Sequence, residues 1–283
     1  MTDAAAASRP LSGDDILRYS RHLLLPGFGA ATQQRLRDGR VLVVGAGGLG
    51  SPVIIYLAAA GVGTLGIIDN DVVDLTNLQR QIVHGVSDIG RSKVTSATEA
   101  VAALNPGVRV VEHDTRLGAD NVMQLIAEYD VIVDGVDNFA ARFLLNDACV
   151  LAGKTLVEAG ILRFGGLVMT IRGGESACYR CVFNEPPPPG AVPSCSEAGV
   201  LGSVAGVVGA LQANEVIKVL TGIGEPLLGR LLQFDALRTE FYEVAVGRAA
   251  GCAVCGDAPT ITAPIEYDLS CALRSGAEPS AHA

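Results

Sequence analysis

Arg40-Val-Leu-Val-Val44 runs directly into Gly45-Ala-Gly-Gly-Leu-Gly50, and this stretch decides the fold that the sequence predicts. The apolar residues predict a buried strand, and residues 51–60 predict a helix. The glycines between them let the backbone approach a phosphate, and the N-terminus of the helix favours an anion. Asp69 ends the next predicted strand, at about the 20-residue spacing of a carboxylate that binds ribose hydroxyls. The stretch therefore predicts a nucleotide site for NAD or ATP, with a glycine turn that only packs two elements as the alternative.

Composition places the chain among compact globular proteins, since 49% of its 283 residues are hydrophobic and 18% are charged. A net charge of −9 argues against a nucleic-acid partner, because phosphate-binding proteins usually carry a basic face. No apolar run reaches the roughly 18 residues of a membrane span, and the start of the chain lacks a secretory signal pattern. Seven cysteines, four of them in metal-type spacing, indicate a reducing compartment. We therefore expect a cytoplasmic protein with no membrane or nucleic-acid partner.

Strands alternate with helices as far as residue 159, which predicts a Rossmann-like α/β fold with a mostly parallel sheet covered by helices on both faces. Beyond Gly160, three strands around one long helix predict an antiparallel extension of the same sheet. We expect a single domain at 1–259, with an N-terminal helical arm at 11–37 and a partly disordered tail at 260–283. The predicted strands are 40–44, 64–69, 108–112, 131–134, 155–159, 167–171, 230–234 and 240–246. The predicted helices are 14–25, 30–37, 51–60, 92–104, 119–128, 139–151 and 203–220.

Polar side chains that follow Asp69 favour ATP over NAD. A dinucleotide pyrophosphate is held mainly by backbone groups, whereas a triphosphate and a departing pyrophosphate call for Arg, Lys and Mg²⁺. Asp137 and Asn138 follow another predicted strand at the carboxyl edge, where open sheets bind ligands, and Asp137 is a candidate Mg²⁺ ligand. As alternatives, Asn138 caps the next helix and Lys93 is an exposed side chain. The other polar residues of this group are Asp71, Asn77, Gln79 and Arg80.

Two Cys-x-x-Cys pairs, Cys178 with Cys181 and Cys252 with Cys255, predict a zinc site. Four thiolates close a tetrahedral shell around one Zn²⁺, and a shell supplied entirely by protein is structural rather than catalytic. A redox dithiol is the alternative for each pair. Cys149 lies among apolar residues and is expected in the core.

In this order the motifs resemble the MoeB/ThiF adenylyltransferases, relatives of the ubiquitin-activating enzymes. The resemblance extends from about Leu17 to Cys255. It rests on Arg18-Tyr-Ser-Arg21, GAGGLGSP from Gly45, Ile67-Ile-Asp69-Asn-Asp71, Asn77-Leu-Gln-Arg80-Gln, Gly90-x-x-Lys93, Asp137-Asn138, CYRC, CSEAGV and CAVC.

The resemblance implies a homodimeric enzyme that uses ATP and Mg²⁺ and contains one structural zinc ion. It would adenylate the C-terminal Gly-Gly carboxylate of a small ubiquitin-like sulfur-carrier protein and release pyrophosphate. Arg21 would reach the partner subunit's site as an arginine finger. Catalysis would rest on Arg21, Arg80, Lys93 and Asp137. The residues expected to contact the nucleotide or its ion are Gly45, Gly47, Gly48, Asp69, Asn77, Gln79, Arg80, Lys93, Asp137 and Asn138.

This mechanism needs no histidine, because a carboxylate is already ionised at neutral pH and attacks without a general base. His84 is accordingly expected to be structural. Cys195 follows a proline-rich loop at 186–190, and the resemblance leaves it either a covalent role with the carrier or a passive one.

Two other functions remain open on the sequence. An NAD-dependent oxidoreductase explains the glycines and Asp69 but not Arg80, Lys93, Asp137 or the cysteines. A non-catalytic scaffold of the same fold would not need the intact polar set. The sequence does not choose among carriers for molybdopterin, thiamine, cysteine or thiolated tRNA, and sulfur is expected to come from a separate sulfurtransferase.

Overall fold

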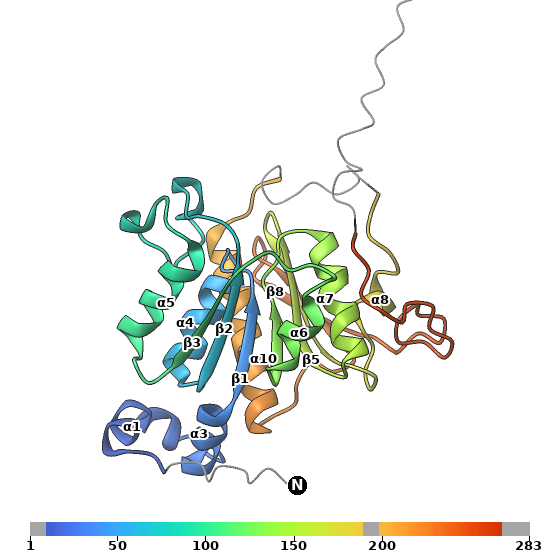
Figure 1. Ribbon diagram of the computed structural model, residues 1–283. Helices are drawn as coiled ribbons and strands as arrows, with labels where there is room; N and C mark the ends of the chain where they lie inside the picture. The colour runs from blue at the N-terminus through green and yellow to red at the C-terminus, as the bar shows by residue number, and fades with distance from the viewer. Residues whose placement is uncertain (1–9, 189–197, 268–283) are drawn as a thin grey trace, which may run out of the picture.

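An eight-stranded sheet forms the centre of the computed structural model, which describes residues 10–188 and 198–267 (Figure 1). The strand order is β3-β2-β1-β4-β5-β6-β7-β8. The first five strands of this order run parallel, and β6, β7 and β8 extend the sheet antiparallel, which confirms the predicted fold class. The strands are β1 (Arg40–Val44), β2 (Thr64–Asp69), β3 (Arg109–Asp114), β4 (Val131–Asp134), β5 (Thr155–Leu162), β6 (Gly165–Arg172), β7 (Arg230–Asp235) and β8 (Glu240–Ala245).

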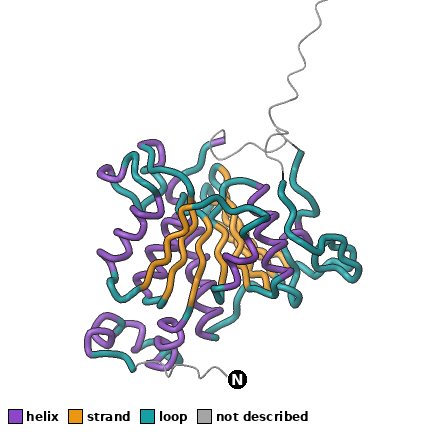
Figure 2. Tube along the Cα trace, viewed as in Figure 1, coloured by secondary structure: helices purple, strands orange, loops and turns teal. Residues whose placement is uncertain are grey.

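Helices cover both faces of the sheet, and Figure 2 shows the strands between two helical layers. Short 3₁₀ turns η1 (Leu75–Asn77) and η2 (Val86–Asp88) lie in the long connection after β2. The helices are α1 (Gly13–Arg18), α2 (Ser20–Leu23), α3 (Gly29–Asp38), α4 (Gly50–Ala60), α5 (Lys93–Leu104), α6 (Val122–Ala127), α7 (Phe139–Leu151), α8 (Tyr179–Val182) and α10 (Gly202–Thr221).

The side-chain alternation of β1 divides the core into two clusters. Val41 and Val43 face one layer, in which α4, α5 and α10 pack. Leu42 and Val44 face the other, which contains α6, α7 and the cysteine pairs. Burial on both faces explains why this strand is an uninterrupted apolar run rather than an alternating one.

The predicted helix at 14–25 is wrong in one respect, because it is interrupted at Tyr19. Ser12 caps α1 with a capping box, and Tyr19 then leaves helical geometry between α1 and α2. Its buried hydroxyl accepts a hydrogen bond from Asn105 Nδ2 (2.8 Å) and lies against Gly61, where a Cβ would be 2.3 Å from it. This tertiary contact, which no local pattern reports, fixes the N-terminal arm to the amino ends of the strands.

The loop between β1 and α4, residues 45–50 and here called the glycine loop, requires glycine for space. A Cβ on Gly50 would lie 1.8 Å from the carbonyl oxygen of Gly45. Gly45 has φ +96°, and a Cβ there would lie 2.6 Å from the carbonyl oxygen of Gly135 in the β4–α7 turn. Loop and turn therefore meet backbone to backbone at the carboxyl ends of β1 and β4.

The core helix α10 corrects one expectation from composition. It is 20 residues long with a mean hydropathy of 1.3, so by length and composition it could span a membrane. In the fold it packs against α4 and β5, and Gln212 donates to the carbonyl oxygens of Asp134 (2.7 Å) and Val157 (3.2 Å). Its apolar character is explained by burial between the sheet and α4.

The expected C-terminal tail does not separate from the domain over its first residues. Ile261 and Tyr267 pack against the core cluster around α7. The Tyr267 hydroxyl donates to Asp147 Oδ2 (3.0 Å), and Glu266 accepts from the backbone N–H of Ala119 (2.9 Å). The segment as far as residue 267 is thus part of the folded body.

We expect Gly50→Ala to lower the free energy of unfolding by about 3 kcal/mol or more, because the new methyl group would collide with a backbone oxygen that cannot rotate away. Gly48→Ala is the matched control, since its Cβ would make ordinary van der Waals contacts with the side chains of Arg80 (3.5 Å) and Ala205 (3.7 Å). Urea unfolding of both variants measures the difference. Equal stability of the two would contradict the observed packing of the glycine loop.

Candidate functional site

The candidate site lies at the carboxyl edge of the sheet, where β1 is flanked by β2 and β4. The connections after β1 and β4 leave on opposite faces, and open α/β sheets bind ligands in the crevice expected at such a point. The glycine loop, Asp69 and Asp137 all follow or end strands at this edge. The topology therefore brings together residues that the sequence separates by almost a hundred positions.

Asp69 is fixed by the glycine loop. Its Oδ2 accepts from the backbone N–H of Ala46 (2.8 Å), and its Oδ1 accepts from the N–H of Asp71 (2.9 Å). Each carboxylate oxygen has a second lone pair, so Asp69 retains capacity for ribose hydroxyls. The carboxylate thus links the end of β2 to the loop expected to hold phosphate.

Lys93 is buried, so the alternative of an exposed side chain is wrong. Its side chain is only 7% exposed, and Nζ lies 2.8 Å from Oδ2 of Asp71, whose side chain is 64% exposed. Lys93 begins α5, and its own N–H donates to the carbonyl oxygen of Asp71 (3.0 Å). The ammonium is therefore held next to the crevice by a partner that solvent can compete for.

Arg80 lies over the glycine loop. A Cβ on Gly48 would be 3.5 Å from its Cγ and Cδ, and its Nη1 donates to the carbonyl oxygen of Thr76 (3.1 Å). Asn77 ends η1, where its side chain accepts from the N–H of Asp74 (3.1 Å). The structure thus brings Arg80 and Gly48 together, and assigns Asn77 at least one role within its own turn.

The N-terminus of α10 also borders this region, which sequence reasoning missed. Gly202 packs on the carbonyl oxygen of Gln79, since a Cβ there would be 2.2 Å from it. Ala205 would be 3.7 Å from a Cβ on Gly48. Because α10 begins more than a hundred residues after the glycine loop, only its small residues could have indicated this approach.

Asp137 and Asn138 have separate roles in the turn. Asn138 Oδ1 accepts from the N–H of Ala141 (2.9 Å) and caps α7, which confirms the alternative that the sequence left open. Asp137 is exposed, and among the described residues its Oδ1 accepts one long 3.4 Å hydrogen bond, from Asn138 Nδ2. A carboxylate this free, at the edge that phosphates would occupy, has the chemistry of a Mg²⁺ ligand.

His84 supports the glycine loop from behind. Its Nε2 lies 3.0 Å from the carbonyl oxygen of Ala46, and its Nδ1 lies 2.8 Å from Ser96 Oγ. Burial lowers the pKa of His84, which favours the neutral imidazole. These contacts agree with the expected structural role of His84.

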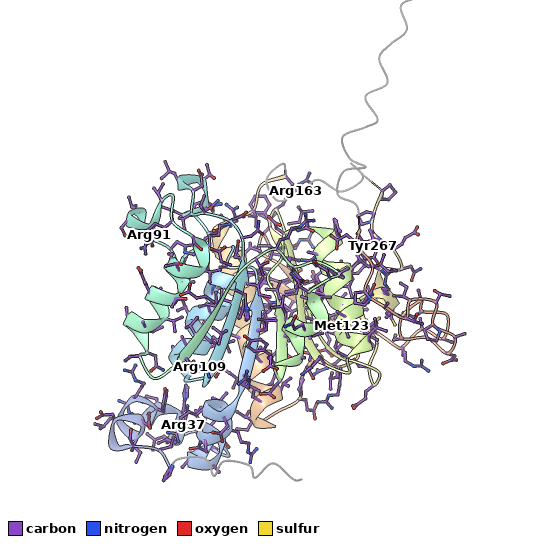
Figure 3. All side chains as sticks on the ribbon, viewed as in Figure 1. Arg37, Arg91, Arg109, Met123, Arg163 and Tyr267 are labelled. Carbon is purple, nitrogen blue, oxygen red and sulfur yellow. The ribbon has the colours of Figure 1, made fainter. Side chains whose placement is uncertain are left out.

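Arg21 lies far from this crevice within its own chain. It is exposed on α2, in the arm that packs at the amino ends of the strands through Arg18 and the carbonyl oxygen of Leu104 (3.0 Å). Figure 3 shows Arg37 of the same arm and Arg163 of the β5–β6 turn at opposite ends of the sheet. Within residues 10–188 and 198–267 the Arg21 side chain makes no hydrogen bond or ion pair. Cys195 lies outside the described residues.

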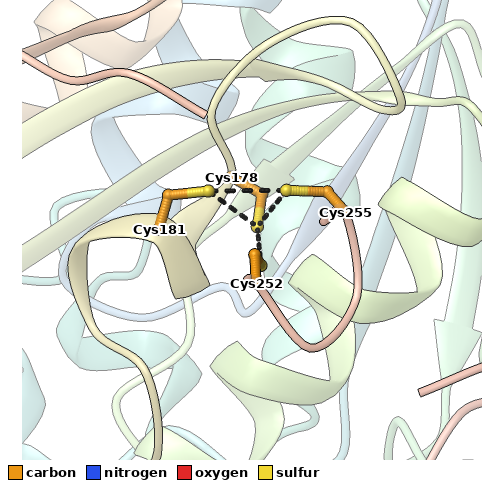
Figure 4. Close-up of side chains that lie close together, drawn as sticks. All are labelled: Cys178, Cys181, Cys252 and Cys255. Atoms are coloured by element: carbon orange, nitrogen blue, oxygen red, sulfur yellow. Dashed lines mark hydrogen bonds between the residues drawn. The ribbon is translucent and has the colours of Figure 1, made fainter. Parts of the chain in front are cut away.

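The four cysteines of the two pairs converge at one point (Figure 4). Cys178 Sγ lies 3.9 Å from Cys181 Sγ, 3.6 Å from Cys252 Sγ and 3.4 Å from Cys255 Sγ. A regular tetrahedron of Zn–S bonds of about 2.3 Å needs sulfur atoms about 3.8 Å apart. The cluster therefore has the dimensions of a closed metal site.

Burial of the clustered cysteines disfavours the charged thiolate form unless a cation is bound. Burial raises the pKa of Cys255 to about 12 and moves that of Cys178 further above its ordinary range, whereas for Cys252 the effect of burial is outweighed by hydrogen bonds that lower the pKa. Thiols bind metal as thiolates, so a bound cation would offset the cost of keeping them charged. The cysteines in the described part of the chain are free rather than paired in disulfides.

Arg180, between the first two cysteines, joins the cysteine cluster to α7. Its Nε and Nη2 donate to the two oxygens of the fully buried Asp147 (2.7 and 2.9 Å). Asn146 Oδ1 accepts from the N–H of Tyr179 (2.9 Å). The helix that begins at the Asp137 turn is thus attached to the cysteine cluster at its far end.

Comparison with known proteins identifies close relatives. The model described as "ThiF family" matches residues 19–254. "Probable adenylyltransferase/sulfurtransferase MoeZ" of Mycobacterium tuberculosis is 49% identical over 93% of this chain and 67% of the relative. "Sulfur carrier protein adenylyltransferase" of Thermus thermophilus is 47% identical over 92% of this chain and 98% of the relative. Among solved structures, E. coli MccB with ATP superposes with a TM-score of 0.74 and 26% identity over 84% of this chain and 74% of that chain.

We expect freshly prepared protein to contain about one zinc ion per chain, and Cys252→Ser to reduce this content sharply. Loss of the metal should cost at least about 2 kcal/mol of stability and lower the Tm by roughly 5 °C, because buried thiols lose their cation. Cys149→Ala should keep the full metal content, because Cys149 is buried in the core and is not one of the four clustered cysteines. Elemental analysis that finds well below one zinc per chain in fresh wild-type protein would refute the metal site.

Proposed function

The chain belongs to the ThiF family, and from that membership and the carboxyl-edge cluster we propose that it uses ATP to adenylate the C-terminal carboxylate of a small ubiquitin-like sulfur-carrier protein. The observation that carries the proposal is the convergence of Gly48 with Arg80, and of the buried Lys93, on one crevice that Asp69 and Asp137 border. This combination suits a triphosphate, because it supplies several donors and a free carboxylate for a metal ion.

In the proposed reaction, an oxygen of the carrier's terminal Gly-Gly carboxylate forms a bond to the α-phosphorus of ATP. The bond from that phosphorus to the bridging oxygen breaks, and pyrophosphate leaves with the electron pair. No proton moves from the nucleophile, so a catalytic base is unnecessary. Lys93 and Arg80 are assigned to the developing charge on the leaving phosphates.

The remaining residues of the crevice bind and orient the nucleotide. The glycine loop and the N-terminus of α4 are assigned to phosphate, and Asp69 to the ribose hydroxyls. Mg²⁺ held by Asp137 would neutralise charge on the phosphates. Precise placement of the carboxylate against the α-phosphorus supplies the rest of the rate enhancement.

An oxidoreductase that uses NAD receives less support from the same geometry. Binding of a dinucleotide would not require a buried lysine beside an exposed aspartate, or the exposed carboxylate of Asp137. A non-catalytic scaffold likewise leaves Lys93 without a reason to be buried at this edge. The four-cysteine site is assigned to zinc with a structural role, because all four ligands come from the protein.

We also propose a homodimer in which Arg21 acts in the partner's crevice. Arg21 lies at the opposite end of its own sheet from the glycine loop and is exposed, so it can contribute to a crevice only across a subunit interface. An arginine supplied in trans would add positive charge at the departing pyrophosphate. For the sulfur, a separate sulfurtransferase is the proposed source, and Cys195 is a candidate for a covalent link to the carrier.

Lys93→Ala should reduce carrier-dependent exchange of labelled pyrophosphate into ATP by about 100-fold, because one charge-stabilising donor is lost from the crevice. Arg109→Ala is the control, since Arg109 is an exposed arginine at the amino end of β3 (Figure 3). Candidate carriers that end in Gly-Gly serve as substrates. Absence of exchange with every carrier tested, from folded wild-type protein, would sink the adenylation proposal.

Mixing two inactive proteins tests the role of Arg21 across the dimer. Arg21→Ala and Lys93→Ala should each leave little exchange, but a mixed dimer has one crevice with both residues intact. Random reassociation should therefore restore about a quarter of the wild-type rate, as expected for a symmetric dimer with shared sites. Mixing Arg21→Ala with the double variant Arg21→Ala/Lys93→Ala should restore nothing. Failure of the first mixture to recover, with dimers verified by light scattering, would mean that Arg21 does not act in trans.

A further inference from the structure

Three buried ionisable side chains lie next to the β4–α7 turn and have no role in the reaction described so far. Asp134 ends β4, Arg142 lies on α7 and Glu158 lies on β5. Both acidic side chains are fully buried, and the Arg142 side chain is 11% exposed. Arg142 Nε lies 3.2 Å from Asp134 Oδ2 and 3.0 Å from Glu158 Oε1. One guanidinium group therefore lies within ion-pair distance of two carboxyl groups.

This group holds the backbone of the β4–α7 turn from both sides. Asp134 Oδ1 accepts from the N–H of Val136 (2.8 Å), and Arg142 Nη2 donates to the carbonyl oxygen of Val136 (3.2 Å). The carbonyl group of Val136 belongs to the peptide bond that joins Val136 to Asp137. The same Nη2 donates to the carbonyl oxygen of Ala159 (2.8 Å), which anchors the turn to β5.

Glu158 is the unusual member of the group. The Arg142 Nε–H is directed at Asp134, and neither oxygen of Glu158 has a hydrogen-bond partner among the described residues. Buried carboxylates without donors are costly, and a proton on Glu158 supplies the missing donor toward Asp134. Burial, and next the Asp134 carboxylate, raise the pKa of Glu158 well above its ordinary range. The positive charge of Arg142 acts in the opposite direction, but the net shift of the Glu158 pKa is upward. Tyr179 and Cys149 are further ionisable side chains that interact with this carboxyl group.

We propose that Asp134, Arg142 and Glu158 form a clamp that positions Asp137 to bind Mg²⁺ during adenylation. Arg142 balances the charge of Asp134, and Glu158 fills the remaining space beside them as a neutral acid. None of the three touches substrate, and each acts through the turn that it fixes. The inference rests on the proposed function, because Asp137 needs a position only if a metal–nucleotide complex is bound there.

The clamp also explains how the turn keeps its contact with the glycine loop. Gly135 lies against the loop so closely that a Cβ would be 2.9 Å from the carbonyl oxygens of both Gly45 and Val44. A turn free to move by even an ångström would lose this contact and displace the metal ligand relative to the phosphates. Fixing Val136 from two sides holds the ligand and the loop in one arrangement.

The test measures ATP affinity by calorimetry, with and without Mg²⁺, in Arg142→Lys, Glu158→Ala and Glu158→Gln. The first two should weaken Mg²⁺ binding to the ATP complex by about tenfold or more, as is usual for groups that orient a metal ligand. Their ATP affinity without Mg²⁺ should stay within about twofold of wild type. Glu158→Gln should behave as wild type, because a neutral amide replaces a neutral acid. Arg172→Lys is the control, because Arg172 forms an exposed 3.5 Å ion pair with Glu175 at the end of the sheet opposite the candidate site.

A double-variant cycle separates positioning from general damage. In an Asp137→Asn background the Mg²⁺ effect is already lost, so adding Arg142→Lys should cost nothing more. An additive loss there, or unchanged Mg²⁺ affinity in folded Arg142→Lys and Glu158→Ala, would overturn the clamp. Tenfold weakening by Glu158→Gln, the variant that best keeps the shape of the core, would overturn the neutral state of Glu158. Wild-type protein that does not bind ATP at all would instead count against the proposed function.

Discussion

The glycine loop and the β4–α7 turn meet backbone to backbone at Gly45 and Gly135, and the two halves of the candidate site face each other because of this contact. One half supplies phosphate-binding N–H groups and the other supplies Asp137. Side chains at either position would separate β1 from β4 at their carboxyl ends, where the strand order creates the crevice. The support behind this contact, from His84 on one face and Arg142 on the other, consists of buried polar groups that an apolar core would not require.

Much of the fold follows from local pattern. Strands β1, β2 and β4 and helix α7 have the predicted limits, because each is an apolar run bounded by Gly, Asp or an Asn cap. The long helix α10 and the antiparallel extension were also recognisable. The helix break at Tyr19 was not recognisable from the sequence, because the break depends on Asn105 and Gly61, which lie far along the chain.

The residues of the candidate site likewise include some that local pattern predicts and some that it does not. Asp69 and the glycine loop could be predicted because their spacing reflects one strand, one turn and one helix. The burial of Lys93 could not be predicted, because lysine on a helix is usually exposed. Only the fold of the segment after β2 encloses this side chain. Nothing in the sequence indicated the role of Glu158, because a glutamate in an apolar strand suggests a side chain on an exposed edge strand. Its partners Asp134 and Arg142 become neighbours only when β4, α7 and β5 pack together.

The last described residues bear on where this domain ends. The family match stops at residue 254, but Tyr267 covers the Arg180–Asp147 pair and Glu266 binds the turn before α6. A protein shortened to the end of the match would open a buried ion pair to water at the place where the cysteine cluster is attached to α7. A recombinant form of this domain should therefore include Tyr267 rather than stop at Cys255, if the buried pair is to stay protected from water and proteases.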